Sequence, residues 1–172
     1  MNKYLIFLII PFTLLVSCGG TNQEVEKQLT SPNNIKNQDI ETQNIEKDWI
    51  EFKIKAVGNT MSDMKFDIEN IQVNEGSWVR IILINEGEQI AMQHNIVFVN
   101  YGARKEVATQ AIEAGPSMKY IPSNENIIAA SDLAQPGETI TLEFKAPKKG
   151  NYEFVCTYPG HSESMRGYFI VK

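Results

Sequence analysis

Cysteine and histidine are scarce in this chain, with two of each among its 172 residues. Cys18 follows an N-terminal apolar run and Cys156 lies near the C-terminus, so no disulfide framework is available to the rest of the chain. Basic residues are also in the minority, because 16 Lys and Arg face 21 Asp and Glu and give a formal net charge of -5. This mildly acidic balance argues against nucleic acid as a partner. No internal repeat is visible.

The apolar run at the N-terminus is too short to span a membrane, and polar or helix-breaking residues interrupt it. It extends over residues 5–16, is broken by Pro11 and Thr13, and follows the positive charge of Lys3, as in an export signal. Its end, Leu15-Val16-Ser17-Cys18, resembles a bacterial lipobox, which implies cleavage before Cys18 and lipid attachment to its sulfur. The alternative is an ordinary secretory signal that happens to end near a cysteine.

We therefore expect residues 1–17 to be a lipoprotein signal peptide and Cys18 to carry the lipid. Lipid chains bury CH₂ groups at about 0.8 kcal/mol each, so a triacylated N-terminus would hold the protein on a membrane. The protein would be exported and would face the periplasm, and Gly19 in place of an aspartate favours the outer membrane. Residues 18–47 are polar and contain no aromatic residue, which predicts a disordered tether.

Residues 48–172 have the size of one domain and mostly strand-like patterns. Short alternating or apolar segments bounded by turn sequences predict strands. These strands are expected over residues 50–56, 78–84, 94–99, 139–144, 152–156 and 167–171. Residues 103–114 are helix-like and end at Gly115-Pro116, so we expect one helix outside the strands. The pattern predicts an all-β sandwich or barrel with one inserted helical segment.

A thiol, an imidazole and a thioether lie close together in the segment Cys156-Thr-Tyr-Pro-Gly-His161-Ser-Glu-Ser-Met165. The other histidine is His94, so both histidines and the remaining thiol can converge on one metal ion. A thiolate, two imidazoles and a weak axial thioether are the ligand set of a blue-copper site. We therefore predict one type 1 copper ion bound by His94, Cys156 and His161, with Met165 as the axial ligand.

Other interpretations of these residues stay open. Zinc accepts two histidines and a cysteine, but its fourth ligand is usually a nitrogen, a thiolate sulfur or an oxygen. Cys156 and His161 could form a nucleophile–base pair, although no glycine framework for an oxyanion hole lies nearby. They could also be a buried cysteine and a surface histidine of a metal-free structural lipoprotein. We expect no enzyme activity.

The segments Met92-Gln93-His94-Asn95 and Phe154 to Gly167 match a known family pattern. They resemble the azurin and auracyanin branch of the cupredoxins, and the resemblance extends over about residues 49–172. It implies a cupredoxin-like Greek-key β-sandwich of about eight strands with a helical flap. It also implies a one-electron carrier that cycles between Cu(I) and Cu(II), in which Asn95 and Thr157 tie the two ligand loops together by hydrogen bonds.

The resemblance has further implications for the metal and for partners. The Gln93 carbonyl, where azurins have a glycine, is a candidate weak axial contact. In the family the second histidine, here His161, emerges through an apolar patch that docks redox proteins, so His161 is the expected electron port. Met92, Tyr158 and Pro159 would keep that patch apolar.

The expected partners are redox proteins such as c-type cytochromes or terminal reductases and oxidases. We expect the domain of residues 48–172, called the head below, to bind them as a monomer. The rival function is a copper-binding protein that buffers or delivers the metal without carrying current.

Overall fold

The computed structural model describes residues 47–172. The predicted signal peptide, the lipid site at Cys18 and residues 18–46 of the predicted tether lie outside the described residues. In the described part, each helix is too short or too polar to cross a membrane.

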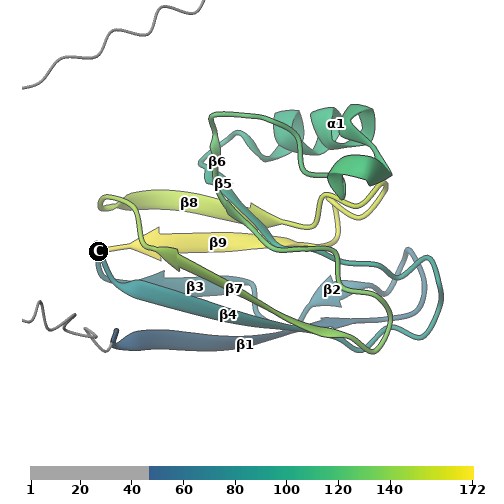
Figure 1. Cartoon of the computed structure of the whole chain (residues 1–172), viewed down its shortest axis with the longest axis horizontal. Coiled ribbons are helices and arrows are strands. Elements are labelled where there is room, and N and C mark those ends of the chain that lie inside the picture. Colours follow the sequence, from purple (N-terminus) through teal and green to yellow (C-terminus); the bar gives the residue numbers. More distant parts are fainter. Residues whose placement is uncertain (1–46) are drawn as a thin grey trace, which may run out of the picture. The chain divides into compact units, whose positions relative to one another are not determined.

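Two β-sheets face each other and enclose the core (Figure 1). The first sheet has four strands in the order β2-β1-β4-β7, and the second has five strands in the order β3-β9-β8-β5-β6. The bounds are β1 Trp49–Val57, β2 Lys65–Phe66, β3 Asn70–Val73, β4 Trp78–Asn85, β5 Val97–Asn100, β6 Ile127–Ala130, β7 Thr139–Lys145, β8 Gly150–Val155 and β9 Arg166–Val171. The helix α1 covers Arg104–Ala114, and the short 3₁₀ helix η1 covers Pro116–Met118.

The order of the strands is that of a Greek-key sandwich. β1 runs parallel to β4, and β3 runs parallel to β9, whereas the other strand pairs are antiparallel. Since a parallel pair needs a crossover connection, the chain passes from one sheet to the other between its partners. The expected all-β sandwich is thus confirmed, with nine strands among the described residues where about eight were expected.

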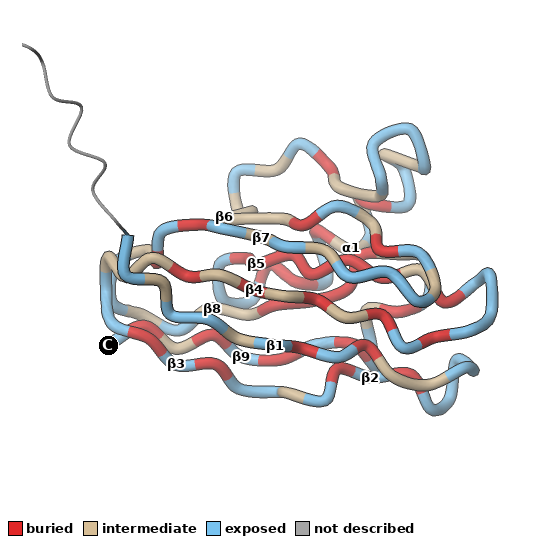
Figure 2. Tube along the Cα trace, turned by 60° about the horizontal axis from the view of Figure 1, so that its bottom comes forward, coloured by how far each residue is buried: buried red, intermediate tan, exposed pale blue. Residues whose placement is uncertain are grey.

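Alternation along the strands builds the core, as the red and blue segments in Figure 2 show. In β4, Val79, Ile81 and Leu83 are at most 1% exposed, while the residues between them are half-buried. Rings from the opposing sheet meet across the interior, for example Phe98 and Phe144 with centroids 4.8 Å apart. Because each buried side chain of this size stabilises the fold by about 1.5–3 kcal/mol, this interior supports both sheets.

The helix lies on the outer face of the five-stranded sheet, as expected (Figure 1). Its buried Val107 packs with Ala103 against the outward-facing Val97, Val99 and Val155 and forms a second, smaller apolar cluster. β5 is therefore buried on both faces. Gly115 directly follows the helix, and its φ of 69° is a left-handed value that glycine adopts without a Cβ penalty.

The sequence predicted the long strands better than the short ones. β2, β3 and β6 were not predicted, because two to four residues are too few to establish an alternating pattern. One predicted strand was too long, since β5 begins at Val97 rather than at His94. His94 instead forms an isolated bridge with Ala134.

Gly167 in β9 tests the packing against its neighbours in the five-stranded sheet, which are β8 and the residue before β3. A Cβ at this position would overlap the Phe154 ring and the Glu69 carbonyl oxygen. We therefore expect Gly167→Ala to lower the free energy of unfolding by about 2–3 kcal/mol, as overpacking of a core does. Urea denaturation measures this loss.

The matched control is Gly150→Ala in β8, where the Cβ would lie 3.3 Å or more from the side chain of Tyr152. Gly150→Ala should lower stability by less than half as much. Equal effects of the two substitutions would contradict the packing described at Gly167.

Candidate metal centre

The loop that joins β8 to β9, residues 156–165, carries three of the predicted ligands and is called the ligand loop below. Cys156 directly follows β8 and Met165 directly precedes β9, and the Cys156 amide donates to the Met165 carbonyl at 2.9 Å. Within the loop, the His161 amide donates to the Tyr158 carbonyl at 3.1 Å, and the Met165 amide donates to the His161 carbonyl at 2.9 Å. The loop is thus a compact turn closed at its base.

His94 comes from a second loop, between β4 and β5. Its backbone exchanges two hydrogen bonds with Ala134, at 3.1 and 2.8 Å. The buried Asn85 side chain donates to the carbonyls of Met92 and Ala134 at 2.7 and 3.1 Å and so fixes this loop from the end of β4. Asn85 was not predicted to support the site, since nothing in the sequence shows that its side chain turns towards the loop that carries His94.

Three donor atoms of these loops meet in one buried place. His94 Nδ1 and His161 Nδ1 are 3.1 Å apart, and Cys156 Sγ lies 3.9 and 3.8 Å from them. All three residues are at most 1% exposed. A point equidistant from the three atoms lies about 2.1 Å from each, close to the bonds of about 2.0–2.3 Å that zinc forms with imidazole and thiolate.

The donor set and its geometry fit a copper ion. The three atoms form a triangle, and a trigonal arrangement of two imidazoles and a thiolate is typical of blue-copper sites. Met165 is fully buried at the base of the ligand loop. Its role as the axial ligand stays a prediction. The axial contact from the Gln93 carbonyl also stays a prediction. Nε2 of His94 is buried and lacks a hydrogen-bond partner among the described residues.

Hydrogen bonds between Asn95 and Thr157 connect the two ligand-bearing loops. The Thr157 amide donates to Asn95 Oδ1 at 2.8 Å, and Asn95 Nδ2 donates to Thr157 Oγ1 at 2.9 Å. Thr157 Oγ1 also lies 2.6 Å from the Tyr120 carbonyl, which brings in a third segment. Tyr120 and Lys119 have φ values of 56° and 52°, so this segment is held in a left-handed backbone conformation.

Burial sets the protonation of the metal-free site. It lowers the pKa of His94 to about 3, with the neighbouring His161 adding to the effect, and lowers the pKa of His161 to about 4. Burial also raises the pKa of the Cys156 thiol to about 12. At neutral pH the metal-free site therefore holds two neutral imidazoles and a protonated thiol.

The pH dependence of stability follows from these shifts. Below pH 6.5 the unfolded chain binds more protons at its two histidines than the folded chain does, so the metal-free protein loses stability as the pH falls from 6.5 towards 3. Above pH 9 the unfolded chain loses the Cys156 proton first, so stability also falls as the pH rises towards 12.

His161 and Met92 are more deeply buried than expected. The role of His161 as the electron port stays a prediction. The His161 ring does not reach the surface, since the residue is 1% exposed and the Tyr158 ring lies against it with centroids 4.8 Å apart. Met92 is 3% exposed and belongs to the core, so it cannot present an apolar face to a partner. Tyr158 and Pro159 are half-buried.

No sequence pattern predicts a role for Met61. Its terminal methyl lies over Gly160, because a Cβ built on Gly160 would come within 2.6 Å of it. Met61 is 53% exposed and therefore supplies apolar surface beside the ligand loop. It belongs to the connection between β1 and β2, and nothing in the sequence links that connection to His161.

This chain is similar to known copper proteins. The family model described as copper binding proteins, plastocyanin/azurin family, matches residues 50–172. Auracyanin-A of Chloroflexus aurantiacus is 35% identical over 118 residues, covering 67% of this chain and 72% of that protein. The outer membrane protein H.8 of Neisseria gonorrhoeae is 29% identical over 117 residues, covering 65% of this chain and 64% of that protein.

The solved structure of auracyanin A, titled a "blue" copper protein, has a TM-score of 0.65 and 33% identity. The match covers 72% of this chain and 99% of that one.

Proton release tests the protonation of the site. Because the thiol is protonated and both imidazoles are neutral, binding of one Cu(II) should release about one proton, and the number should be the same at pH 6 and pH 8. Calorimetry in buffers of different ionisation enthalpy counts the protons. Two histidines with ordinary pKa values near 6.5 would add about 1.5 protons at pH 6, and that result would contradict the account.

Proposed function

Because this chain belongs to the plastocyanin/azurin family of copper-binding proteins, we propose that it carries single electrons between redox proteins outside the cytoplasm. The observation that carries the proposal is the triangle of His94 Nδ1, His161 Nδ1 and Cys156 Sγ, buried and sized for one metal ion. The cofactor is one type 1 copper ion. When bound, it supplies a one-electron couple between Cu(I) and Cu(II).

We propose that His94, Cys156 and His161 are the equatorial ligands and that Met165 is the axial one. The protein's contribution is to hold these donors still, because a carrier works fastest when its ligands do not move as the charge changes. The hydrogen bonds of Asn95, Thr157 and Asn85 serve this purpose, since each joins segments that belong to different strands. Such outer hydrogen bonds commonly orient metal ligands.

Burial of the metal site favours a function in electron transfer over a function in copper delivery. A protein that hands copper to an acceptor needs an accessible ligand at which exchange can begin. Here all three donors are at most 1% exposed, and Tyr158 covers His161. We therefore place electron carrying ahead of copper buffering, and we propose no catalytic role.

We propose that partners dock where the ligand loop meets the surface. Tyr158 is half-buried and lies against His161, so it gives electrons a short path from the surface to a ligand. Pro159 and the exposed Met61 extend this area with apolar atoms. Partners would be redox proteins such as c-type cytochromes or terminal reductases and oxidases, met by a monomeric head.

The location is proposed from the N-terminal sequence. A signal peptide over residues 1–17 and a lipid on Cys18 would place the protein on a membrane facing the periplasm, with the outer membrane favoured. The relative from Neisseria gonorrhoeae is named an outer membrane protein, which agrees with this location. Globomycin treatment of producing cells tests it, because accumulation of the uncleaved precursor is expected of a lipoprotein.

Cys156→Ser tests the metal ligands. The wild-type protein with one equivalent of Cu(II) should show an intense blue thiolate-to-copper absorption, and Cys156→Ser should lose it completely, since this absorption is a charge transfer from the thiolate sulfur to the copper. Visible absorption spectroscopy is the measurement. Cys18→Ser, which changes the other of the two cysteines, is the matched control and should keep the colour. A blue Cys156→Ser protein would overturn the ligand assignment.

Met165→Leu tests the axial position. Removing a weak thioether ligand destabilises Cu(II) more than Cu(I), so the reduction potential should rise while the blue colour persists. We expect the reduction potential to rise by about 60 mV, which corresponds to a tenfold change in the equilibrium constant of a one-electron reduction. Met64→Leu, at another buried methionine, is the matched control and should leave the potential unchanged. An unchanged potential in Met165→Leu would remove Met165 from the site.

A further inference from the structure

Arg104 is the one Lys, Arg, Asp or Glu that is buried among residues 47–172. It is the first residue of α1 and is 7% exposed. Removing a charged side chain from water is unfavourable unless partners replace the water, and apolar residues of similar volume often stabilise a fold as well or better. A buried arginine on a helix that otherwise packs through alanine and valine therefore calls for a specific role.

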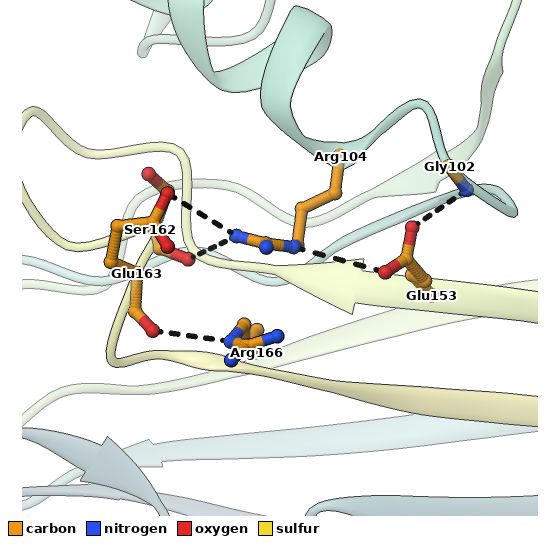
Figure 3. Close-up of polar contacts among 6 residues, drawn as sticks. All are labelled: Gly102, Arg104, Glu153, Ser162, Glu163 and Arg166. Carbon is orange, nitrogen blue, oxygen red and sulfur yellow. Dashed lines mark hydrogen bonds and ion pairs between the residues drawn. The ribbon is translucent and has the colours of Figure 1, made fainter.

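The partners of Arg104 lie on two different segments, as Figure 3 shows. Its Nη1 donates a hydrogen bond to the Ser162 carbonyl at 2.9 Å and lies 3.8 Å from the Glu163 carboxylate. On its other side, the buried Nε makes no hydrogen bond within residues 47–172 and lies 3.8 Å from the Glu153 carboxylate of β8, at ion-pair distance. The guanidinium thus spans from β8 to the ligand loop.

Glu153 anchors the other end of this bridge. Its side chain is 12% exposed, and its second carboxylate oxygen accepts a hydrogen bond from the Gly102 amide at 2.8 Å. β8, the turn before α1 and the guanidinium are therefore joined in one network. Glu163 is different, because its side chain is 69% exposed and its attraction to Arg104 is screened by water.

The contact with Ser162 matters because of its position in the ligand loop. Ser162 directly follows His161, whose carbonyl accepts the amides of Ser164 and Met165 inside the loop. Arg104 holds the next carbonyl along the chain from outside. The backbone on the C-terminal side of His161 is thus restrained by the helix, while Thr157 restrains the loop near Cys156.

We propose that Arg104 is a positioning residue of the metal site: it fastens the ligand loop to α1 and β8 and so holds His161 facing His94 and Cys156 before copper binds. The proposal rests on the proposed function, since it assigns the inserted helix a part in keeping the copper ligands still. The helical flap then acts as a support for the ligand loop.

The test compares amide hydrogen exchange in the copper-free proteins. In Arg104→Met the amides of His161, Ser164 and Met165 should exchange at least tenfold faster than in the wild type, equivalent to about 1.4 kcal/mol. The amides of Val79 and Ile81 in the central strand β4 should change by less than threefold. Equal acceleration at both places, or no acceleration in the loop, would overturn the proposal.

Two further variants sharpen the result. Arg80→Met is the matched control, because Arg80 pairs with Glu143 on the outer face of the other sheet and should leave the loop amides unchanged. Arg104→Lys keeps the charge but has one nitrogen in place of the two, Nη1 and Nε, that face Ser162 and Glu153, so its loop amides should exchange as fast as those of Arg104→Met. This variant also replaces Arg104→Met if that protein fails to fold. Wild-type protection in Arg104→Lys would overturn the proposed bridge.

Copper-loaded protein supplies an independent readout. Arg104 is buried and is not one of the proposed docking residues, so its replacement acts through the ligand loop, and a looser loop should slow electron self-exchange at least threefold. An unchanged rate would contradict the role of Arg104 in positioning the ligands. If the wild type binds no copper as a blue site, the proposed function fails, while the exchange data on the copper-free protein still decide whether Arg104 fastens the loop.

Discussion

The central constraint in this molecule is that two imidazole nitrogens and a thiol sulfur face each other in a space closed to water. The nitrogens are 3.1 Å apart, and both histidines are neutral at physiological pH, because burial lowers the pKa of His94 to about 3 and that of His161 to about 4. Without a metal, burial of these polar atoms removes their hydrogen bonds to water and replaces them only in part, which costs free energy. The rest of the fold must therefore hold them together.

The β-sandwich does this by fixing several segments at one end. β8 and β9 define the base of the ligand loop, and Asn85 at the end of β4 fixes the loop that carries His94. The Asn95–Thr157 pair then joins the two loops directly. A metal bound there would find its ligands already oriented, which is how proteins impose a geometry on an ion.

Much of this arrangement could be predicted from the sequence. With two histidines and one thiol outside the N-terminal region, the chain offers a single way to assemble an imidazole–thiolate site. The long strands were predictable because alternation over several residues identifies a half-buried strand. The short strands β2, β3 and β6 gave too little pattern.

The sequence failed to predict which side chains near the metal site are exposed and which residues hold the ligand loop in place. Both depend on packing between segments that are distant in the sequence. His161 is covered by Tyr158, and Met92 turns inward, although the sequence places both near the expected docking face. Arg104 resembles any surface arginine at the start of a helix until the fold brings Glu153 and Ser162 to it. No local pattern reveals such contacts, because their partners come from β8 and the ligand loop.

Crystal structures of the copper-free and Cu(II)-loaded protein test the central claim most directly, namely that the fold positions the donor atoms before the metal arrives. The account predicts the same triangle in both, with Nδ1–Nδ1 near 3.1 Å and Sγ–Nδ1 near 3.8 and 3.9 Å. A copper-free structure in which the His161 ring has swung away from His94 and Cys156 would show that the metal assembles the site, and would contradict the account.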